Sequence, residues 1–340
     1  MQFKHIFLFL LAVGLLSGCD NLEDLNVNPN QPEEVNPDVL LTSATRTSVN
    51  SMVTESFLLG NNAAQLTAKT LRAEVDVYDW NAFPTVWEEQ FEALASLAEM
   101  EALAQDISTE TGNTNVEGIA LVMKSYIFSV LTAAYGDIPY TEAISGVNGD
   151  DFFPAYDRQE DIYLGSEGLL SELARANDLL DPALGGVGGD ILFDSDVMKW
   201  KKFCNSLRLR LLMHVSNKID VSTDFNRIVE NEPIMESNDD NAALNYLGSF
   251  PNEFPLIPLK QGDFDAVVMS DRSVSVLQNY DDPRLGRYAR PDNILSLDSE
   301  DPIYDGADNG SENADLCDKS GSRLGLPYFN YPGHPIASQA

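Results

Sequence analysis

Apolar positions recur every three or four residues in four segments of the central chain, which is the spacing of one face of an α-helix. The four stripes consist of Trp87, Phe91, Leu94 and Ala98; Ile119, Val122, Tyr126 and Val130; Leu169, Leu173, Ala176 and Leu180; and Trp200, Phe203, Leu207, Leu211 and His214. An earlier amphipathic stretch covers residues 39–52 and continues towards Leu66. The pattern predicts one helix for each of these segments.

Signals for helix starts and stops accompany these stripes. The start signals are capping boxes at Thr85 with Glu88, at Thr114 with Glu117 and, in weaker form, at Asp157 with Glu160. Gly136 and Pro139 end the second helix, and a glycine cluster at residues 185–189 closes the third. We therefore expect helices separated by short connections.

The helices alternate with short links and without strand signals, which predicts stacked helical hairpins. The second helix is apolar nearly all round, so we expect it to be buried between its neighbours. From residue 221 onward the periodicity fades and prolines interrupt the chain. We predict a mostly α fold, with a helical region at 38–220 and a loop-rich region at 221–340 that packs on the helices.

The N-terminus carries targeting information. Lys4 precedes an apolar run at residues 6–16, which is too short to span a bilayer and suits the core of a signal peptide. The run ends in Leu16-Ser17-Gly18-Cys19, which looks like a bacterial lipobox. We predict a lipoprotein signal peptide at 1–18 and a lipid anchor on Cys19 with an extended tether at 19–37. The alternative is a plain secretory signal followed by a chance cysteine.

Composition narrows the classes of function. The chain of 340 residues has 54 acidic and 21 basic side chains and a net charge of −33, which argues against nucleic-acid binding. Three histidines and three cysteines leave little material for metal sites or a disulfide scaffold. The chain contains no signature of a metalloprotease, serine hydrolase or phosphate-binding loop. We therefore predict a non-catalytic protein. An envelope hydrolase is the alternative, because a glycosidase needs only two carboxylates.

Aromatic side chains in predicted loops are the candidate ligand contacts. The loop before the Thr85 capping box contains Tyr78 and Trp80, and Arg72, Asp79 and Asn81 flank them. Sugar rings stack on aromatic faces, while guanidinium, carboxylate and amide groups bond sugar hydroxyls. The loop therefore predicts a glycan contact. The alternative is that Trp80 caps the core.

Two further aromatic sets lie in the loop-rich region. The candidate contacts there are Tyr288 with Arg290, and Tyr328 with Tyr331 on either side of Phe329 and Asn330. An acidic loop at 298–318 has oxygen ligands of the kind calcium prefers, but it lacks the EF-hand spacing. We expect no cofactor, with a calcium site as the alternative. Cys204 and Cys317 have the option of pairing, but a small apolar filler suits Cys204 better.

Several short motifs, taken in order, resemble one known family. They are Asn28-Pro29-Asn30 in the tether, Ala134-Tyr135-Gly136-Asp137-Ile138-Pro139-Tyr140 at a helix end, Trp200-Lys201-Lys202-Phe203-Cys204-Asn205-Ser206-Leu207-Arg208-Leu209-Arg210, and Asp282-Pro283-Arg284-Leu285. Together with the lipobox they resemble the SusD/RagB family of outer-membrane nutrient-binding lipoproteins, and most closely its SusD-like branch. The resemblance covers essentially the whole chain.

The resemblance implies a fold, a partner and a location. The fold is a set of tetratricopeptide-like helix pairs with an irregular ligand-binding half, whose loops converge with a loop between early helices. The partner is a SusC-like TonB-dependent β-barrel transporter in the outer membrane of Bacteroidetes, over whose mouth the lipoprotein sits. Family members carry a further helix with a Tyr-Ala-Glu and Ala-Glu-Ala type motif that this sequence lacks, so we expect a truncated chain.

The functional prediction is therefore capture of a nutrient polymer and its delivery to the transporter. A neutral glycan is favoured, because the acidic surface repels anionic substrates. A peptide is the alternative within the family resemblance, because some relatives capture peptides. A helical-repeat scaffold that binds no ligand is an alternative of another class.

Overall fold

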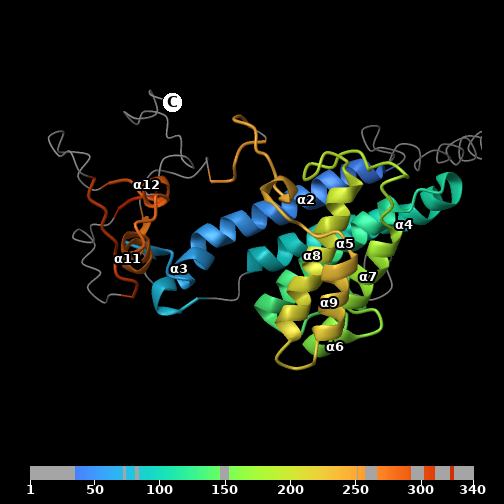
Figure 1. The fold of residues 1–340 in the computed structure, drawn as a ribbon, viewed down its shortest axis with the longest axis horizontal. Helices are drawn as coiled ribbons and strands as arrows, with labels where there is room; N and C mark the ends of the chain where they lie inside the picture. Colours follow the sequence, from blue (N-terminus) through green and yellow to red (C-terminus); the bar gives the residue numbers. More distant parts are fainter. Residues whose placement is uncertain are drawn as a thin grey trace, which may run out of the picture. The chain divides into compact units, whose positions relative to one another are not determined.

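The computed structural model describes residues 35–71, 74–80, 84–145, 153–250, 252–256, 266–291, 302–310 and 322–324. All of its helices and strands belong to one compact unit that begins at Pro37. The first part contains α2 (Pro37–Glu55), a π-helical turn η1 (Ser56–Gly60), α3 (Asn61–Ala63), β1 (Thr67–Lys69), η2 (Val75–Val77), α4 (Pro84–Thr111) and α5 (Asn115–Tyr135). Figure 1 shows the course of these elements.

The elements that follow are short except for α8, which is as long as α2. They are α6 (Gln159–Leu164), α7 (Leu169–Leu179), α8 (Val197–Val215), α9 (Ser222–Asn231), η4 (Asn238–Asp240), β2 (Val267–Met269), α11 (Asp271–Asn279) and α12 (Leu285–Tyr288). The described residues after α9 are therefore mostly loops with short helices, which agrees with the sequence pattern. The predicted domain limits themselves stay predictions.

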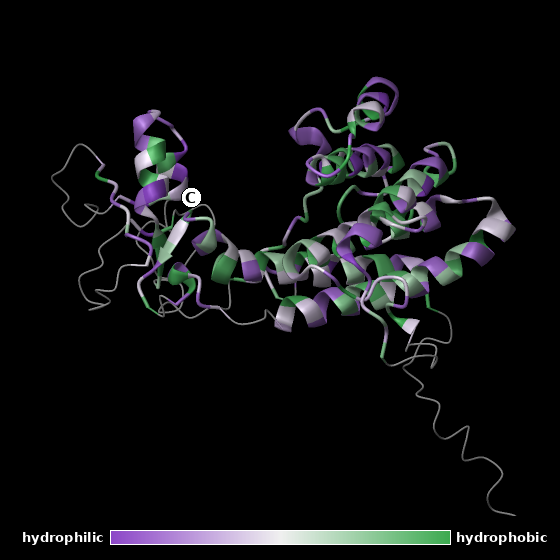
Figure 2. Cartoon of the chain, turned by 90° about the horizontal axis from the view of Figure 1, so that it is seen from below, coloured by the Kyte–Doolittle hydropathy of each residue, from purple (hydrophilic) through white to green (hydrophobic). Residues whose placement is uncertain are grey.

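Each long helix packs against the next one, so the helices stack as antiparallel pairs. The contacts run from α2 to α4, from α4 to α5, from α5 to α7 and from α7 to α8. One continuous core runs through all of them. Figure 2 shows hydrophobic and hydrophilic residues mixed along the helical part of the chain. The predicted fold of tetratricopeptide-like helical hairpins is confirmed.

Helix α5 forms the centre of this stack. It is buried on nearly all sides, as its all-round apolar sequence predicts. Its length and hydropathy would suffice to cross a membrane, but 72% of the apolar window is buried inside the protein. The helix is therefore a core element.

Three details of the predicted helix starts are wrong. Helix α4 begins at Pro84, one residue before Thr85, because proline suits the first helical position. The hydroxyl of Thr114 flanks α5 but donates to the carbonyl of Leu179, 2.6 Å away, because the end of α7 packs there with an open carbonyl. The carboxylate of Asp157 accepts the N–H groups of Tyr140 and Thr141 at 2.9 Å instead of capping α6.

The predicted apolar stripes are correct for α7 and partly wrong for α4 and α8. Leu169, Leu173 and Ala176 of α7 are fully buried. In α4 the most buried face lies about one residue earlier than predicted and leaves Trp87 half-buried. His214 is exposed in the last turn of α8 and lies 3.2 Å from the Tyr163 hydroxyl, so it is not a core residue.

Cys204 is a buried residue of α8, as expected for a small apolar filler. Its thiol donates to the carbonyl of Leu173 at 3.2 Å. Burial raises the pKa of the Cys204 thiol to about 12, so it stays protonated at neutral pH. Cys317 lies outside the described residues, so the pairing of the two cysteines stays untested.

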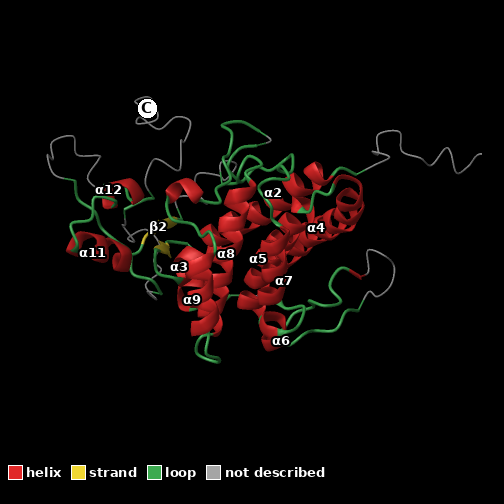
Figure 3. Ribbon diagram, turned by 45° about the vertical axis from the view of Figure 1, so that its right-hand side comes forward, coloured by secondary structure: helices red, strands yellow, loops and turns green. Residues whose placement is uncertain are grey.

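A short antiparallel sheet joins the early helices to the C-terminal half. Thr67 pairs with Met269, and Lys69 pairs with Val267. Asn309 fixes the next loop to this sheet: its amide donates to the carbonyl of Thr67 at 2.8 Å and accepts from Ser270 at 2.6 Å. Figure 3 shows the strands beside α3 and α11.

Candidate functional site

A cleft of about 690 Å³ opens where η1, α3 and β1 meet α11 and α12. This volume lies within the range of small-molecule binding sites. Most of its lining is apolar, with Val53, Phe57, Leu66, Leu256, Val276 and Leu277 among the contributing side chains. The cleft is therefore an apolar site built from two parts of the chain that lie far apart in the sequence.

The N-terminal wall of the cleft has an irregular backbone. Helix α2 passes into the π-helical turn η1, which carries Phe57 into the cleft. The buried side chain of Asn62 donates to the carbonyls of Phe57 and Leu58 at 3.4 and 3.1 Å, and Thr67 donates to Asn62 at 2.9 Å. Gln65, also in the wall, has a positive φ of 55°. Such features concentrate at binding sites.

Tyr78 and Trp80 form an exposed aromatic pair next to this wall. Their ring centroids are 5.1 Å apart at an interplanar angle of 57°, and their exposed fractions are 59% and 38%. Tyr78 adopts a left-handed backbone conformation with φ of 61°, and its hydroxyl donates to the carbonyl of Ala63 at 3.1 Å. The pair presents apolar ring surface to solvent, and Trp80 is not part of the described core clusters.

The remaining candidate residues have different positions. Asp79 is exposed beside the aromatic pair. Tyr288 in α12 lines the apolar cleft, whereas Arg290 does not. The backbone N–H of Arg290 donates to the carbonyl of Arg323 at 2.8 Å, and Arg323 in turn pairs with Val268 of β2. The other candidates lie outside the described residues: Cys19, Arg72, Asn81, Tyr328 and Tyr331.

The structure thus brings two of the predicted sets to neighbouring positions. The hydroxyl of Tyr78 binds Ala63 in α3, and Ala64 directly after it lines the cleft that Tyr288 also lines. Sequence reasoning missed most of the cleft lining, notably Phe57 and Arg272. Two signals pointed to it: the predicted contact Tyr288, and the Asp282-Pro283-Arg284-Leu285 motif, since Arg284 lines the cleft.

Asp282 orders Arg284 at the edge of the cleft. The guanidinium Nε of Arg284 donates to both carboxylate oxygens of Asp282, at 2.9 and 3.0 Å, and the Arg284 backbone N–H donates to the same carboxylate at 2.9 Å. The side-chain bond to Arg284, followed by the backbone bond, lowers the pKa of Asp282 to about 2. The motif therefore fixes the direction of an arginine side chain.

We expect Arg284→Gln to raise the pKa of Asp282 towards the ordinary aspartate value of about 4. A depressed carboxylate pKa stabilises the folded state above the unfolded pKa, and that stabilisation is lost as the pH falls towards about 2. The variant should lose part of this pH dependence, because the backbone N–H at position 284 still binds the carboxylate. NMR titration of the Asp282 carboxyl carbon measures this pKa in the parent protein and in the variant. An unchanged pKa in the variant would show that Arg284 does not hold the carboxylate in solution.

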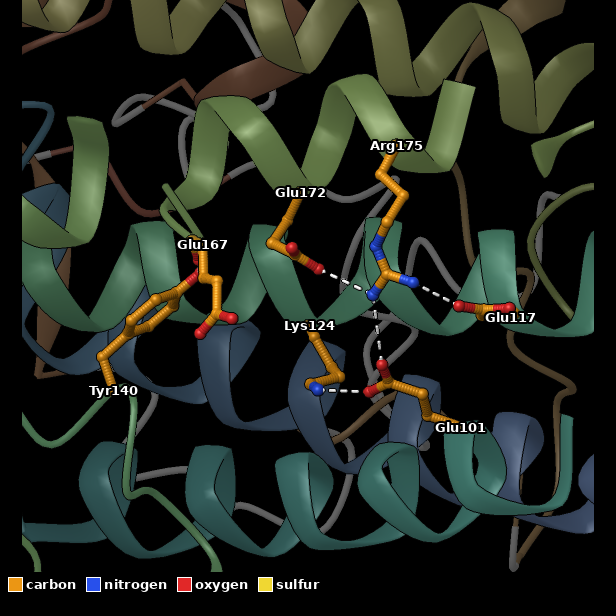
Figure 4. A network of polar contacts seen from close by, with 7 residues as sticks. All are labelled: Glu101, Glu117, Lys124, Tyr140, Glu167, Glu172 and Arg175. Carbon is orange, nitrogen blue, oxygen red and sulfur yellow. Dashed lines mark hydrogen bonds and ion pairs between the residues drawn. The ribbon is translucent and has the colours of Figure 1, made fainter. Parts of the chain in front are cut away.

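A second cavity of about 500 Å³ lies between α4, α5 and α7, and it is polar. Figure 4 shows Arg175 reaching Glu101, Glu117 and Glu172, while Lys124 pairs with Glu101. Burial acts to lower the pKa of Arg175, but the hydrogen bond to Glu172 and the charge of the surrounding carboxylates outweigh it and raise the pKa.

The cations of this second cavity are already paired with the protein's own carboxylates. The network therefore connects three packed helices, and it is a weaker candidate for ligand binding than the apolar cleft. Tyr140, at the edge of the cavity, donates to the backbone carbonyl of Glu167 at 2.7 Å. Burial, together with the charge of nearby carboxylates, raises the pKa of Tyr140, so it stays neutral.

The part of the acidic loop that the structure describes does not gather ligands for a metal. Within the described ranges, no three acidic, histidine or cysteine side chains lie close enough to hold an ion. Asn309 of this loop is bound to Thr67 and Ser270 instead. Asp301 and Asp315 lie outside the described residues, so calcium binding stays an untested alternative.

Comparisons with known proteins agree with the helical fold described above. A SusD-like family model, described as starch-binding and associating with the outer membrane, matches residues 29–327. An outer membrane protein of Bacteroides vulgatus, described in connection with nutrient binding, has a structure similar to this one, with 27% identity and a TM-score of 0.70. That match covers 87% of this chain and 64% of the other. Comparison with curated proteins gives no match.

Two further solved structures share the fold. One is a SusD homologue of Bacteroides fragilis, with 24% identity, a TM-score of 0.69 and coverage of 87% of this chain and 63% of the other. The second is a chitin-binding protein, with 23% identity, a TM-score of 0.68 and coverage of 85% and 64%. The chain thus spans just under two thirds of the length of the structures it matches.

Proposed function

Because the chain belongs to the SusD-like family of starch-binding proteins that associate with the outer membrane, we propose that it captures a nutrient glycan at the cell surface. In this proposal it binds without turning the ligand over and delivers it to a SusC-like TonB-dependent transporter. Cys19 carries the lipid that holds the protein on the outer membrane, facing the exterior. The stacked helices provide the surface that contacts the transporter.

The observation that carries the proposal is the exposed pair of Tyr78 and Trp80. The two rings are partly exposed and lie next to each other, and contiguous exposed apolar surface of this kind marks interaction sites. The rings lie 5.1 Å apart and are inclined by 57°, which presents two differently directed faces. Sugar rings have apolar faces that stack on such surfaces, and the carboxylate of the exposed Asp79 is available to sugar hydroxyls.

The charge of the chain supports a neutral glycan over an acidic one. With a net charge of −33, the protein surface repels polyanions over a distance of about 8 Å at physiological salt. A neutral oligosaccharide meets no such barrier. We expect neutral glucans and related glycans to be the first ligands to test.

Replacing Trp80 by alanine should lower the affinity for the captured glycan about tenfold, which corresponds to ~1.4 kcal/mol. Tyr78→Ala should act in the same direction, because the two rings share one surface. Isothermal titration calorimetry against a panel of neutral oligosaccharides measures the effect. Tyr280→Ala is the matched control, because Tyr280 is an aromatic residue with an exposed fraction of 81% that does not line the cleft.

The same experiment separates the alternatives. If no glycan in the panel binds, or if affinities do not change in Trp80→Ala and Tyr78→Ala, glycan capture at this surface is wrong and a ligand-free scaffold is favoured. Release of shorter sugars from a bound oligosaccharide by the purified protein would instead establish a hydrolase.

Peptide capture is the second candidate, and the apolar cleft favours it. A cleft lined by Phe57, Leu66 and Val276 accepts apolar side chains, whereas it offers few partners to sugar hydroxyls. A panel of peptides with apolar side chains tests this candidate. Peptide binding that Tyr288→Ala weakens and Trp80→Ala leaves unchanged would place peptides in the cleft and argue against the glycan surface.

A further inference from the structure

The apolar cleft has a local charge opposite to that of the chain. Acidic residues outnumber basic ones by 54 to 21 in the sequence, yet no aspartate or glutamate occurs among the described residues that line the cleft. The two charged side chains in this lining are Arg272 and Arg284. The cleft is therefore a positive and apolar site on a strongly acidic protein.

The two arginines differ in their state of pairing. Arg284 is neutralised by Asp282 through two-pronged bonding. The guanidinium of Arg272, in the first turn of α11, makes no hydrogen bond or ion pair within the described part of the chain. The backbone N–H of Arg272 donates to the Ser270 hydroxyl at 3.2 Å, and this bond caps the start of the helix. Arg272 therefore offers five unused N–H donors at the cleft.

The interior of the cleft disfavours ligands that are polar throughout. Burying a hydroxyl without a hydrogen-bond partner is unfavourable. A sugar has several hydroxyls, and the interior around Phe57, Leu256 and Met269 offers mainly carbon atoms. An alkyl chain or an aromatic group fills such a space with no unpaired polar atoms.

We propose that the cleft binds an apolar carboxylate: a ligand with an extended hydrocarbon body in the cleft and a carboxylate paired with Arg272. The planar guanidinium matches a carboxylate in a bidentate arrangement, which a neutral or cationic head group cannot form. This ligand chemistry differs from that of the glycan at Tyr78 and Trp80, and it does not depend on glycan capture.

Three probes with the same ten-carbon chain test the proposal: decanoate, decanol and decyltrimethylammonium. Calorimetric titration below the micelle concentration, on the full protein, compares their affinities. We expect decanoate to bind at least tenfold more tightly than decanol, and the ammonium compound to bind most weakly. Equal binding of decanoate and decanol would overturn the role of Arg272.

Single substitutions test whether decanoate binds in the cleft at Arg272. Arg272→Gln should weaken decanoate about tenfold and leave decanol unchanged, because it removes the charge and keeps the length of the side chain. Arg227→Gln is the matched control, since Arg227 is an exposed arginine of α9 that pairs with Asp224 away from the cleft. Val276→Asp should weaken both probes, and decanoate more strongly.

The outcome is independent of the glycan experiment. If Trp80→Ala abolishes glycan binding while Arg272→Gln leaves decanoate binding unchanged, the cleft proposal fails and glycan capture stands. If Arg272→Gln weakens decanoate and no glycan binds, the cleft proposal stands and glycan capture fails.

Discussion

Replacing Trp200 by alanine is expected to lower the free energy of unfolding by about 3–5 kcal/mol, the usual cost of deleting a large buried aromatic side chain. Trp200 of α8 has no exposed surface, and its ring lies 5.0 Å from that of Phe193. Its indole N–H also donates to the carboxylate of Asp190 at 2.8 Å. Urea unfolding followed by circular dichroism measures the change.

Loss of the Trp200 hydrogen bond adds to the destabilisation, because this bond is one of several that the buried carboxylate of Asp190 accepts. Asp190 accepts from the N–H groups of Leu192, Phe193 and Ser195 at 3.0–3.1 Å, and Trp200 completes the shell of this buried carboxylate. Trp200→Phe keeps most of the ring and removes only this donor, so it should cost roughly 1.5–3 kcal/mol. A loss below about 1 kcal/mol in Trp200→Ala would show that this part of the core repacks.

The second large effect is expected at Asn205, which is fully buried between α7, α8 and the segment after α9. Its amide donates to Asn177 at 2.8 Å and to the carbonyl of Pro233 at 3.1 Å, and its oxygen accepts from Arg208 at 2.9 Å. Asn205→Leu leaves two buried side chains and one partly buried carbonyl without this partner, so we expect a destabilisation of at least ~3 kcal/mol.

Arg208 makes this substitution especially costly. Burial lowers the pKa of Arg208, and its guanidinium depends on Asn205 for a hydrogen-bond acceptor. Asn231→Leu provides the matched control, because Asn231 is exposed in α9 and bonds only its own helix. That change should stay within about 0.5 kcal/mol. Similar losses in both variants would contradict a special role for the buried amide.

The periodic stripes were the most dependable guide to the fold. Leu169, Leu173 and Ala176 are buried as predicted, because the apolar face of α7 packs against its neighbouring helices. The starts of the helices were harder to predict. The Thr114 hydroxyl satisfies the end of α7 rather than the start of α5, and only tertiary packing decides between these two acceptors.

Prediction of the candidate site reached the aromatic pair, but only Tyr288 of the predicted contacts lies in the cleft. Tyr78 and Trp80 stood out because two large aromatic rings occur in a polar loop. The cleft depends on the π-helical turn at Phe57, on the left-handed Gln65 and on the pairing of Thr67 with Met269. None of these follows from local periodicity: the turn is held by side-chain bonds from Asn62, and the strand pairing joins segments far apart in the sequence.

The family-like motifs also proved to have structural roles. In the Tyr-Gly-Asp-Ile-Pro block, Asp137 accepts from the N–H of Gln159 at 2.8 Å, and Ile138 forms a bridge with Asp157. Asn205 and Arg208 form the buried network described above. These motifs preserve the stack of helices, so they identify the fold, while the ligand must be identified from the exposed surfaces.

The sheet between β1 and β2 has a consequence for the order of folding. The helical pairs form contacts between neighbouring parts of the chain, and such contacts form quickly. The pairing of Thr67 with Met269 joins residues about 200 positions apart, so it forms more slowly. During folding, the helical stack is therefore able to assemble while the apolar cleft is still missing one wall. We infer that the protein becomes competent to bind in the cleft only in the last stage of folding, after β2 has docked.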